Sequence, residues 1–204
     1  MSDKNDIEKE AILAEQLITH AKDGDMDAFG DLYDIYLPRI YRYCFARVRN
    51  TAEAEDLAEE IFLKALSNMH KFNWSRAIGG ANPFTAWLFR IAHNHVISFT
   101  RRLSNKNPTS ELGDWIPDKE RTPEQEIELQ LSIDEVFQAV QSLPSAQRDV
   151  IMMRFSAGLS IAETAQALDK KESNVKVLQH KAVNSLKKSM VTNTDIDDTE
   201  MSVS

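Results

Sequence analysis

Residues 160–188, SIAETAQALDKKESNVKVLQHKAVNSLKK, contain two helical patterns separated by a short turn. Ser160 and Glu163 form a capping-box pair, which predicts that a short helix begins directly after Ser160. The polar residues 169–171 are expected to make the turn, and a longer helix then covers residues 172–189. A short helix, a tight turn and a longer helix form the layout of a helix-turn-helix unit.

The longer helix of this unit has one apolar and one polar face. The apolar residues recur at the spacing of an inner helix face, and they are Val175, Leu178, Ala182 and Leu186. The outer face then carries Asn174, Lys176, Val177, His180, Lys181 and Asn184. Asn and Lys can hydrogen-bond base edges or phosphates, and Val can contact a thymine methyl group. The pattern favours DNA binding, with an ordinary helical hairpin and a solvated polar face as the alternative.

The rest of the chain also predicts helices. Its 204 residues include only 6 Gly and 6 Pro, which disfavours a turn-rich β fold. Apolar residues at helical spacing predict helices over 7–22, 26–49, 52–70, 83–103, 123–142 and 145–156. Pro38 is expected to kink its segment or to begin a new helix there. Residues 70–82, with their Gly pair, are expected to form a loop.

A polar segment divides the chain. Residues 104–122 are rich in Ser, Asn, Pro and acidic residues, which predicts a flexible acidic linker. The predicted fold is therefore all-α, with two small helical domains joined by this linker. The expected divisions are an N-terminal helical extension at 1–21, a domain of four helices at 22–103, the linker at 104–122, a second domain at 123–190 and an acidic disordered tail at 191–204.

The net charge of −8 conceals an uneven distribution of charge. Residues 35–106 hold eleven bases and five acids, and residues 136–190 hold eight bases and four acids. Acidic residues dominate the stretches before, between and after these two blocks. The distribution fits two polyanion-binding modules flanked by acidic segments, and it equally fits ordinary solvated helix faces.

Several functional classes lack sequence support. Cys44, the single cysteine, can form neither an internal disulfide nor a thiolate zinc site. His93 and His95 are two residues apart on a predicted helix, so they do not form a metal pair. No phosphate-binding loop or catalytic triad is evident, so we predict no enzyme activity, cofactor, metal or small-molecule substrate. No apolar run approaches about 18 residues, which predicts no membrane insertion and a cytoplasmic protein.

Four segments of the chain together resemble one family of transcription proteins. They are AEDLAEEIFLKAL (54–66), PFTAWLFRIAHN (83–94), LPSAQRDVIMMRFSAGLSIAETAQAL (143–168) and SNVKVLQHKA (173–182). In this order they resemble the extracytoplasmic-function (ECF) group of bacterial sigma-70 factors, which keeps only regions 2 and 4. The resemblance implies a non-catalytic subunit that binds core RNA polymerase, reads the −10 and −35 promoter elements and melts the −10 region. It also implies contacts with the β flap and an anti-sigma partner.

The resemblance assigns residues to each contact. The segment 55–64 resembles region 2.2, which docks on the β′ clamp helices, and implies core-polymerase contacts by Asp56, Leu57, Glu59, Glu60, Phe62 and Lys64. Glu59 stands where most members have Gln. Opposite charges on two partners speed and orient docking, which suits these carboxylates. For Leu57 and Phe62, burial in the core is the alternative.

The first domain is also expected to meet the −10 element, since residues 87–102 resemble regions 2.3 and 2.4. The implied contacts are Asn73, Trp74, Arg76, Arg90, His93, Asn94, Arg101 and Arg102. The loop at 70–82 corresponds to a loop that captures a flipped-out base in the family, although it is longer here. Trp87 is expected to belong to the core rather than to stack on a base.

Residues 174–181 resemble the region 4.2 recognition helix, which reads the −35 element in the major groove. The implied contacts are Ser173, Asn174, Lys176, Val177, His180 and Lys181. Leu178 and Gln179 reverse the usual polar-then-apolar order, so either of the two could face the DNA. Two other functions remain open at this point: a helix-turn-helix regulator that acts without polymerase, and a helical interaction protein with no role on DNA.

Overall fold

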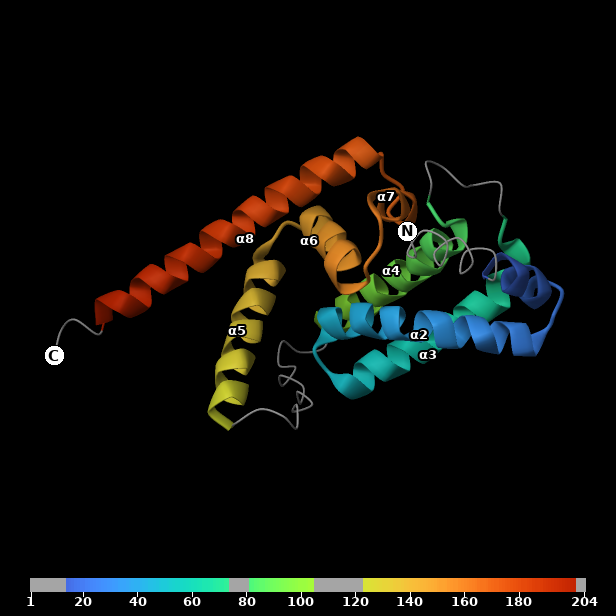
Figure 1. Ribbon diagram of the computed structural model, residues 1–204, viewed down its shortest axis with the longest axis horizontal. Helices are drawn as coiled ribbons and strands as arrows, with labels where there is room; N and C mark the ends of the chain where they lie inside the picture. The colour runs from blue at the N-terminus through green and yellow to red at the C-terminus, as the bar shows by residue number, and fades with distance from the viewer. Residues whose placement is uncertain (1–13, 74–80, 105–122, 201–204) are drawn as a thin grey trace, which may run out of the picture.

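A computed structural model describes residues 14–73, 81–104 and 123–200, with the side chains of residues 104, 123–132 and 191–200 excepted (Figure 1). The described residues form helices, turns and short connections, without a strand. After a helix at residues 14–22, the elements are α2 (Met26–Val48), α3 (Thr51–Asn68), η1 (Met69–Lys71), α4 (Pro83–Ser104), α5 (Pro123–Ser142), α6 (Ser145–Ile151), η3 (Met152–Ser156), α7 (Ile161–Ala167) and α8 (Glu172–Glu200). The all-α prediction is confirmed.

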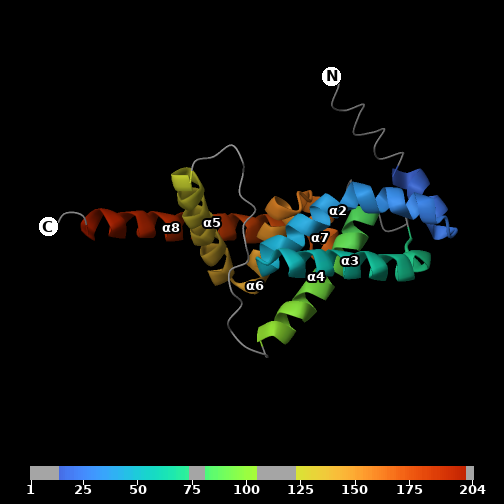
Figure 2. The same cartoon turned by 90° about the horizontal axis from the view of Figure 1, so that it is seen from below.

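α2 and α3 pack side by side in the N-terminal half, as both views show (Figures 1 and 2). The Asp25 carboxylate accepts hydrogen bonds from the first backbone N–H groups of α2, and the Asn50 side chain caps α3 in the same way. α2 continues through Pro38, so the new helix expected there does not begin. Tyr36 and Ile40 are both buried on either side, and their packing keeps the segment helical although proline lacks an N–H group.

α4 packs across α2 and α3 and completes the core of the N-terminal half. Its buried residues include Leu88 and two rings that make edge-on contacts with α2, Phe84 with Tyr36 and Phe89 with Tyr43. Ala92 and Val96 of α4 are buried as well, at positions that the apolar spacing predicted to face inward.

The helix-turn-helix prediction is confirmed in the C-terminal half. Ser160 Oγ accepts from the Glu163 N–H at 3.1 Å, and the Glu163 carboxylate accepts from the Ser160 N–H at 2.7 Å, which completes the capping box that begins α7. Asp169 adopts a left-handed conformation, with φ of 54°, in the turn before α8. The backbone of α8 runs on to Glu200, so residues 191–200, expected to be disordered, are helical here. Extending a formed helix costs less than starting one.

η3 is a π-helical turn that directly follows α6. The Ala157 N–H donates to the Met152 carbonyl at 3.2 Å, a bond that spans five residues rather than four. The sequence predicted an uninterrupted helix over 145–156 and gave no sign of this wider turn. Its apolar residues Met152 and Met153 are buried against the N-terminal half.

The two halves share one continuous hydrophobic core among the described residues. Leu32, Tyr36 and Ile40 of α2 belong to the same buried cluster as Val140, Leu143, Ile151, Met152, Met153 and Leu159 of the C-terminal half. α2 contacts η3, and α4 contacts α7. The sequence predicted two domains but not their packing together. None of the described helices is long and apolar enough to cross a membrane.

Candidate polymerase and DNA interfaces

The outer face of α3 carries most of the side chains expected to contact polymerase. Asp56, Glu59, Glu60 and Lys64 are exposed along this face. Leu57 and Phe62 are buried, with 2% and 4% of their surface exposed, so they are core residues as the alternative interpretation held. The face that a partner could touch is therefore chiefly acidic.

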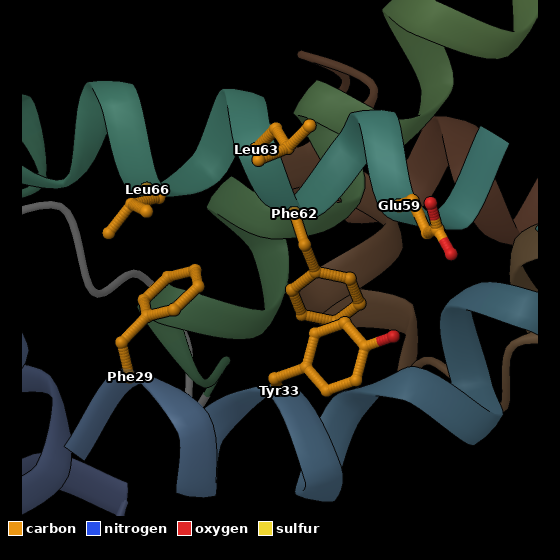
Figure 3. Close-up of a pocket in the computed structure, with 6 residues that line it drawn as sticks. All are labelled: Phe29, Tyr33, Glu59, Phe62, Leu63 and Leu66. Carbon is orange, nitrogen blue, oxygen red and sulfur yellow. The ribbon is translucent and has the colours of Figure 1, made fainter. Parts of the chain in front are cut away.

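A small apolar groove lies beside this acidic face, between α2 and α3 (Figure 3). Its volume is about 230 Å³, and it is lined by Phe29 and Tyr33 of α2 and by Glu59, Phe62, Leu63 and Leu66 of α3. The rings of Tyr33 and Phe62, both part of its lining, pack at 4.6 Å between their centroids. Leu63 is 64% exposed at its rim, which leaves a large apolar side chain available to a partner.

His95 of α4 joins two of the acidic-face residues, a role that the sequence did not predict. Its Nε2 lies 2.6 Å from the Glu60 carboxylate, and its Nδ1 accepts from the Lys64 ammonium. The His95 ring is buried, and this burial, with the nearby Lys64 charge, lowers its pKa. A neutral imidazole with the proton on Nε2 satisfies both contacts and orients Glu60 and Lys64.

The side chains expected at the −10 element do not form one exposed surface. Asn73, Asn94, Arg101 and Arg102 are exposed, whereas Trp74 and Arg76 lie outside the described residues. Arg101 and Arg102 occupy the last turn of α4, where cations are favoured by the helix dipole. Trp87 is partly buried and packs against Phe72 and Phe84 at 5.4 and 5.5 Å between ring centroids, at the edge of the core.

Arg90 and His93 of the same set are turned toward the C-terminal half. Arg90 donates to the backbone carbonyls of Gln166 and Ala167 at the end of α7. His93 Nδ1 lies 3.2 Å from the Tyr43 hydroxyl, and its Nε2 lies 3.9 Å from the Asp149 carboxylate. Burial lowers the pKa of His93, and the Asp149 charge opposes that shift.

The outer face of α8 presents the side chains expected at the −35 element. Ser173, Asn174, Lys176, Val177, His180 and Lys181 are all exposed. Leu178 packs against the buried Val150, Ala165 and Val175, so it faces inward. The Gln179 side chain is occupied by Arg154, whose Nε donates to it at 3.1 Å. The sequence left open whether Leu178 or Gln179 faces the DNA. Packing decides the point, because neither residue belongs to the exposed face.

Metal binding and thiol chemistry can each be examined among the described residues. They contain no group of three or more His, Cys, Asp or Glu residues that could hold a metal ion. Cys44 is fully buried, and burial raises the pKa of its thiol to about 12, so the thiolate that would react is scarce at neutral pH.

Comparison with known proteins matches two segments of the chain to two regions of one family. Residues 32–106 match the model of Sigma-70 region 2, and residues 139–188 match that of Sigma-70, region 4. The chain belongs to the sigma-70 family. The first match contains α3 and α4, and the second contains the helix-turn-helix unit. Both regions are those that the sequence resemblance had indicated.

Individual relatives place this sigma factor in the ECF group. It is 31% identical to the ECF RNA polymerase sigma factor SigW of Bacillus subtilis over 192 residues, which cover 88% of this chain and 97% of SigW. It is 38% identical over 173 residues to the ECF RNA polymerase sigma factor BldN of Streptomyces coelicolor, covering 84% of this chain. The match spans 63% of the length of BldN.

Solved structures share the fold of this sigma factor. CnrH, in complex with the cytosolic domain of CnrY, matches with a TM-score of 0.64 at 21% identity and covers 89% of this chain and 97% of CnrH. The sigma factor RpoE, in complex with the anti-sigma factor NepR from Bartonella quintana, matches with a TM-score of 0.59 at 20% identity, over 79% of this chain and 96% of RpoE. At these identities the likeness concerns the fold alone.

Proposed function

We propose that this ECF sigma factor directs promoter-specific initiation by binding core RNA polymerase through α3 and reading promoter DNA with α4 and α8. The observation that carries the proposal is the orientation of α8. Its apolar residues Val175 and Ala182 are fully buried, while its polar and basic residues lie together on the exposed side. A helix held in this way can enter the major groove without any rearrangement of the C-terminal half.

The polymerase contact follows from the charge and shape of α3. Exposed carboxylates beside an apolar groove suit a partner that offers cations around an apolar ridge, because charges orient the encounter while apolar contact stabilises the complex. The β′ clamp helices are the partner that the family resemblance implies. We assign this contact and the −10 contacts to a domain at 22–103, and the −35 contacts to a domain at 123–190.

The protein itself acts by positioning rather than by catalysis. Each of the two DNA contacts is weak alone. Because polymerase fixes the spacing of the two domains, the second contact forms within the same complex once the first has formed. An anti-sigma factor completes the set of partners, since the sigma factor RpoE, which shares this fold, is bound by the anti-sigma factor NepR in its solved complex. The site of action is the cytoplasm, where polymerase and promoter DNA are found.

Run-off transcription with purified core polymerase and a promoter library tests this function. The wild-type protein should yield specific transcripts, and the charge reversals Asp56→Arg and Glu60→Arg should abolish them by preventing polymerase binding. Asp31→Arg reverses an exposed acid on α2 and serves as the matched control, which should remain active. If polymerase does not bind and the protein alone still shifts duplex DNA, the chain is a polymerase-independent regulator instead.

A further inference from the structure

We propose that Arg154 of η3 and Gln179 of α8 are positioning residues for −35 recognition, which fix the direction in which α8 presents its outer face to the DNA. The inference rests on the proposed −35 role of α8. Arg154 Nε donates to the Gln179 side-chain oxygen at 3.1 Å, and both residues are half-buried. Arginine carries donors only, so the amide oxygen of Gln179 is the atom that must face it.

Gln179 interrupts the apolar face of α8. It lies four residues after Val175 and three before Ala182, both fully buried, so it points to their side of the helix. An amide at such a position is unfavourable unless it is hydrogen-bonded, because it has lost contact with water. The bond from Arg154 satisfies the amide oxygen. At this one point a polar pair therefore takes the place of the apolar packing that the neighbouring positions use.

The Arg154 guanidinium also binds the segment that leads into α7. Its Nη1 donates to the carbonyl of Leu159, and Leu159 directly precedes Ser160, whose side chain caps α7. A guanidinium is planar and its donors have fixed directions, so two bonds from one group set the relative position of their acceptors. Arg154 therefore connects three parts of the C-terminal half: η3, the beginning of α7 and α8.

Apolar packing alone would hold α8 less precisely. The residues through which α8 packs on α6 and α7 include Val150, Ala165, Val175 and Leu178. Apolar contacts have no preferred direction, whereas a hydrogen bond weakens as its geometry departs from the favoured one. The outer-face residues Lys176 and His180 lie within one turn of Gln179, so a rotation of α8 at this point would displace side chains expected to meet the DNA.

Discrimination among −35 sequences by the holoenzyme provides the test. A promoter recovered in the run-off assay is compared with its single-base −35 variants. Gln179→Leu fills the position but removes the acceptor, so it should lower the preference for the best sequence by about fivefold, roughly the effect of one hydrogen bond. Gln179→Glu keeps an acceptor and should retain the preference, although its charge weakens binding to every sequence. Gln138→Leu makes the same change at an exposed position of α5 and should match the wild type.

A double variant separates positioning from stability. Replacing both members of a polar pair by apolar side chains can be nearly neutral, so Arg154→Met with Gln179→Leu should unfold in urea close to the wild-type midpoint. Its discrimination should stay reduced, by the same factor as in Gln179→Leu alone, because both changes remove one bond and their losses do not add. A double variant that regains stability and discrimination together would indicate a packing role only and would overturn the proposal.

A direct phosphate contact by Arg154 is the competing explanation. In that case Arg154→Met would weaken binding to all sequences alike and lower the salt dependence by about one ion, while Gln179→Leu would keep its discrimination. Titrations at several salt concentrations measure both effects, and this outcome would contradict the positioning role alone. A wild-type holoenzyme that does not distinguish the −35 variants would instead show that the −35 role of α8 has itself failed.

Discussion

The carboxylate of Asp149 in α6 lies 2.9 Å from the guanidinium of Arg47 in α2 and is largely shielded from water. These residues are 102 positions apart in the chain, and they lie on opposite sides of the boundary between the two conserved regions. Because the pair is buried, it links the energetics of the two halves. The first prediction concerns this link.

The wild-type protein should unfold in one transition, because its halves share a core and a buried ion pair. Arg47→Asp should separate this into two transitions and lower the midpoint of the less stable half by about 5 °C or more, the shift that about 1 kcal/mol produces in a domain of this size. Calorimetry measures this directly. The swap with Asp149→Arg should regain a single transition, and two transitions in both variants would argue against the coupling.

Stability should fall as the pH drops from about 7 to 5.5. Burial lowers the pKa of both His93 and His95 below the value of the unfolded chain, about 6.5. The unfolded state therefore takes up protons first, and the stabilisation present above pH 6.5 is lost as the pH falls toward the folded-state pKa values. Urea titrations across this range measure the slope. The double variant His93→Gln with His95→Gln should show a flatter dependence, and an equal slope would exclude these two residues as its source.

His95 should contribute to polymerase affinity without touching polymerase. His95→Leu removes the hydrogen-bond partner that orients both Glu60 and Lys64. It should weaken core binding by about fivefold, roughly the effect of losing one hydrogen bond. His95→Gln can still donate to Glu60 and accept from Lys64, so it should retain most of the affinity. Equal losses in the two variants would indicate a packing role only. Binding of each variant to surface-immobilised core polymerase measures these affinities.

Neighbouring residues of α8 should respond in opposite ways to truncation. Leu178 packs inward, so Leu178→Ala should lower the free energy of unfolding by about 2 kcal/mol. Val177 is 51% exposed, so Val177→Ala should leave stability within about 0.5 kcal/mol of the wild type and weaken −35 recognition. Urea unfolding and promoter binding by the holoenzyme measure the two effects. The opposite result, with Val177→Ala destabilising the protein and Leu178→Ala weakening −35 recognition, would mean that α8 is rotated about its axis.

Two polar residues of α8 should separate specificity from general attraction. If Asn174 contacts a base edge, Asn174→Ala should cost about 1–3 kcal/mol at one position of the −35 element and relax the preference there. Lys181→Ala should weaken binding to all sequences alike and lower the salt dependence by about one ion. Competition among single-base −35 variants, repeated at several salt concentrations, distinguishes these outcomes. A uniform loss for Asn174→Ala would reassign it to the phosphates.

Local patterns were sufficient for most of the fold. The capping box at Ser160 and the spacing of Val175 and Ala182 depend on residues a few positions apart, and the helices begin and face as those patterns predicted. No new helix begins at Pro38, because tertiary packing around Tyr36 and Ile40 outweighs a local helix breaker, and the kink expected as the other outcome stays a prediction. Packing also determined the orientations of Leu178 and Gln179.

The contacts between distant segments could not be predicted from the sequence. The bond from Arg39 to the Ala157 carbonyl joins residues 118 positions apart, and its acceptor is a backbone group that every residue carries. His95 likewise meets Glu60 only because α4 packs on α3. Arg90 showed the ambiguity most clearly, since a basic side chain suits a phosphate and a helix carboxyl end equally well.

The wide turn at Met152–Ser156 determines how the chain that follows it is rotated about the helix axis. A π-helical turn takes about one more residue per revolution than an α-helical turn, so making it regular α-helix without removing a residue would rotate the downstream chain by roughly 100°. The Ala157 and Gly158 carbonyls would then swing away from Arg39, while α7 and α8 would keep their own packing. A substitution that favours regular α-helix at this point is therefore a route by which a descendant chain could lose the contacts between its halves without altering any residue of its recognition helix.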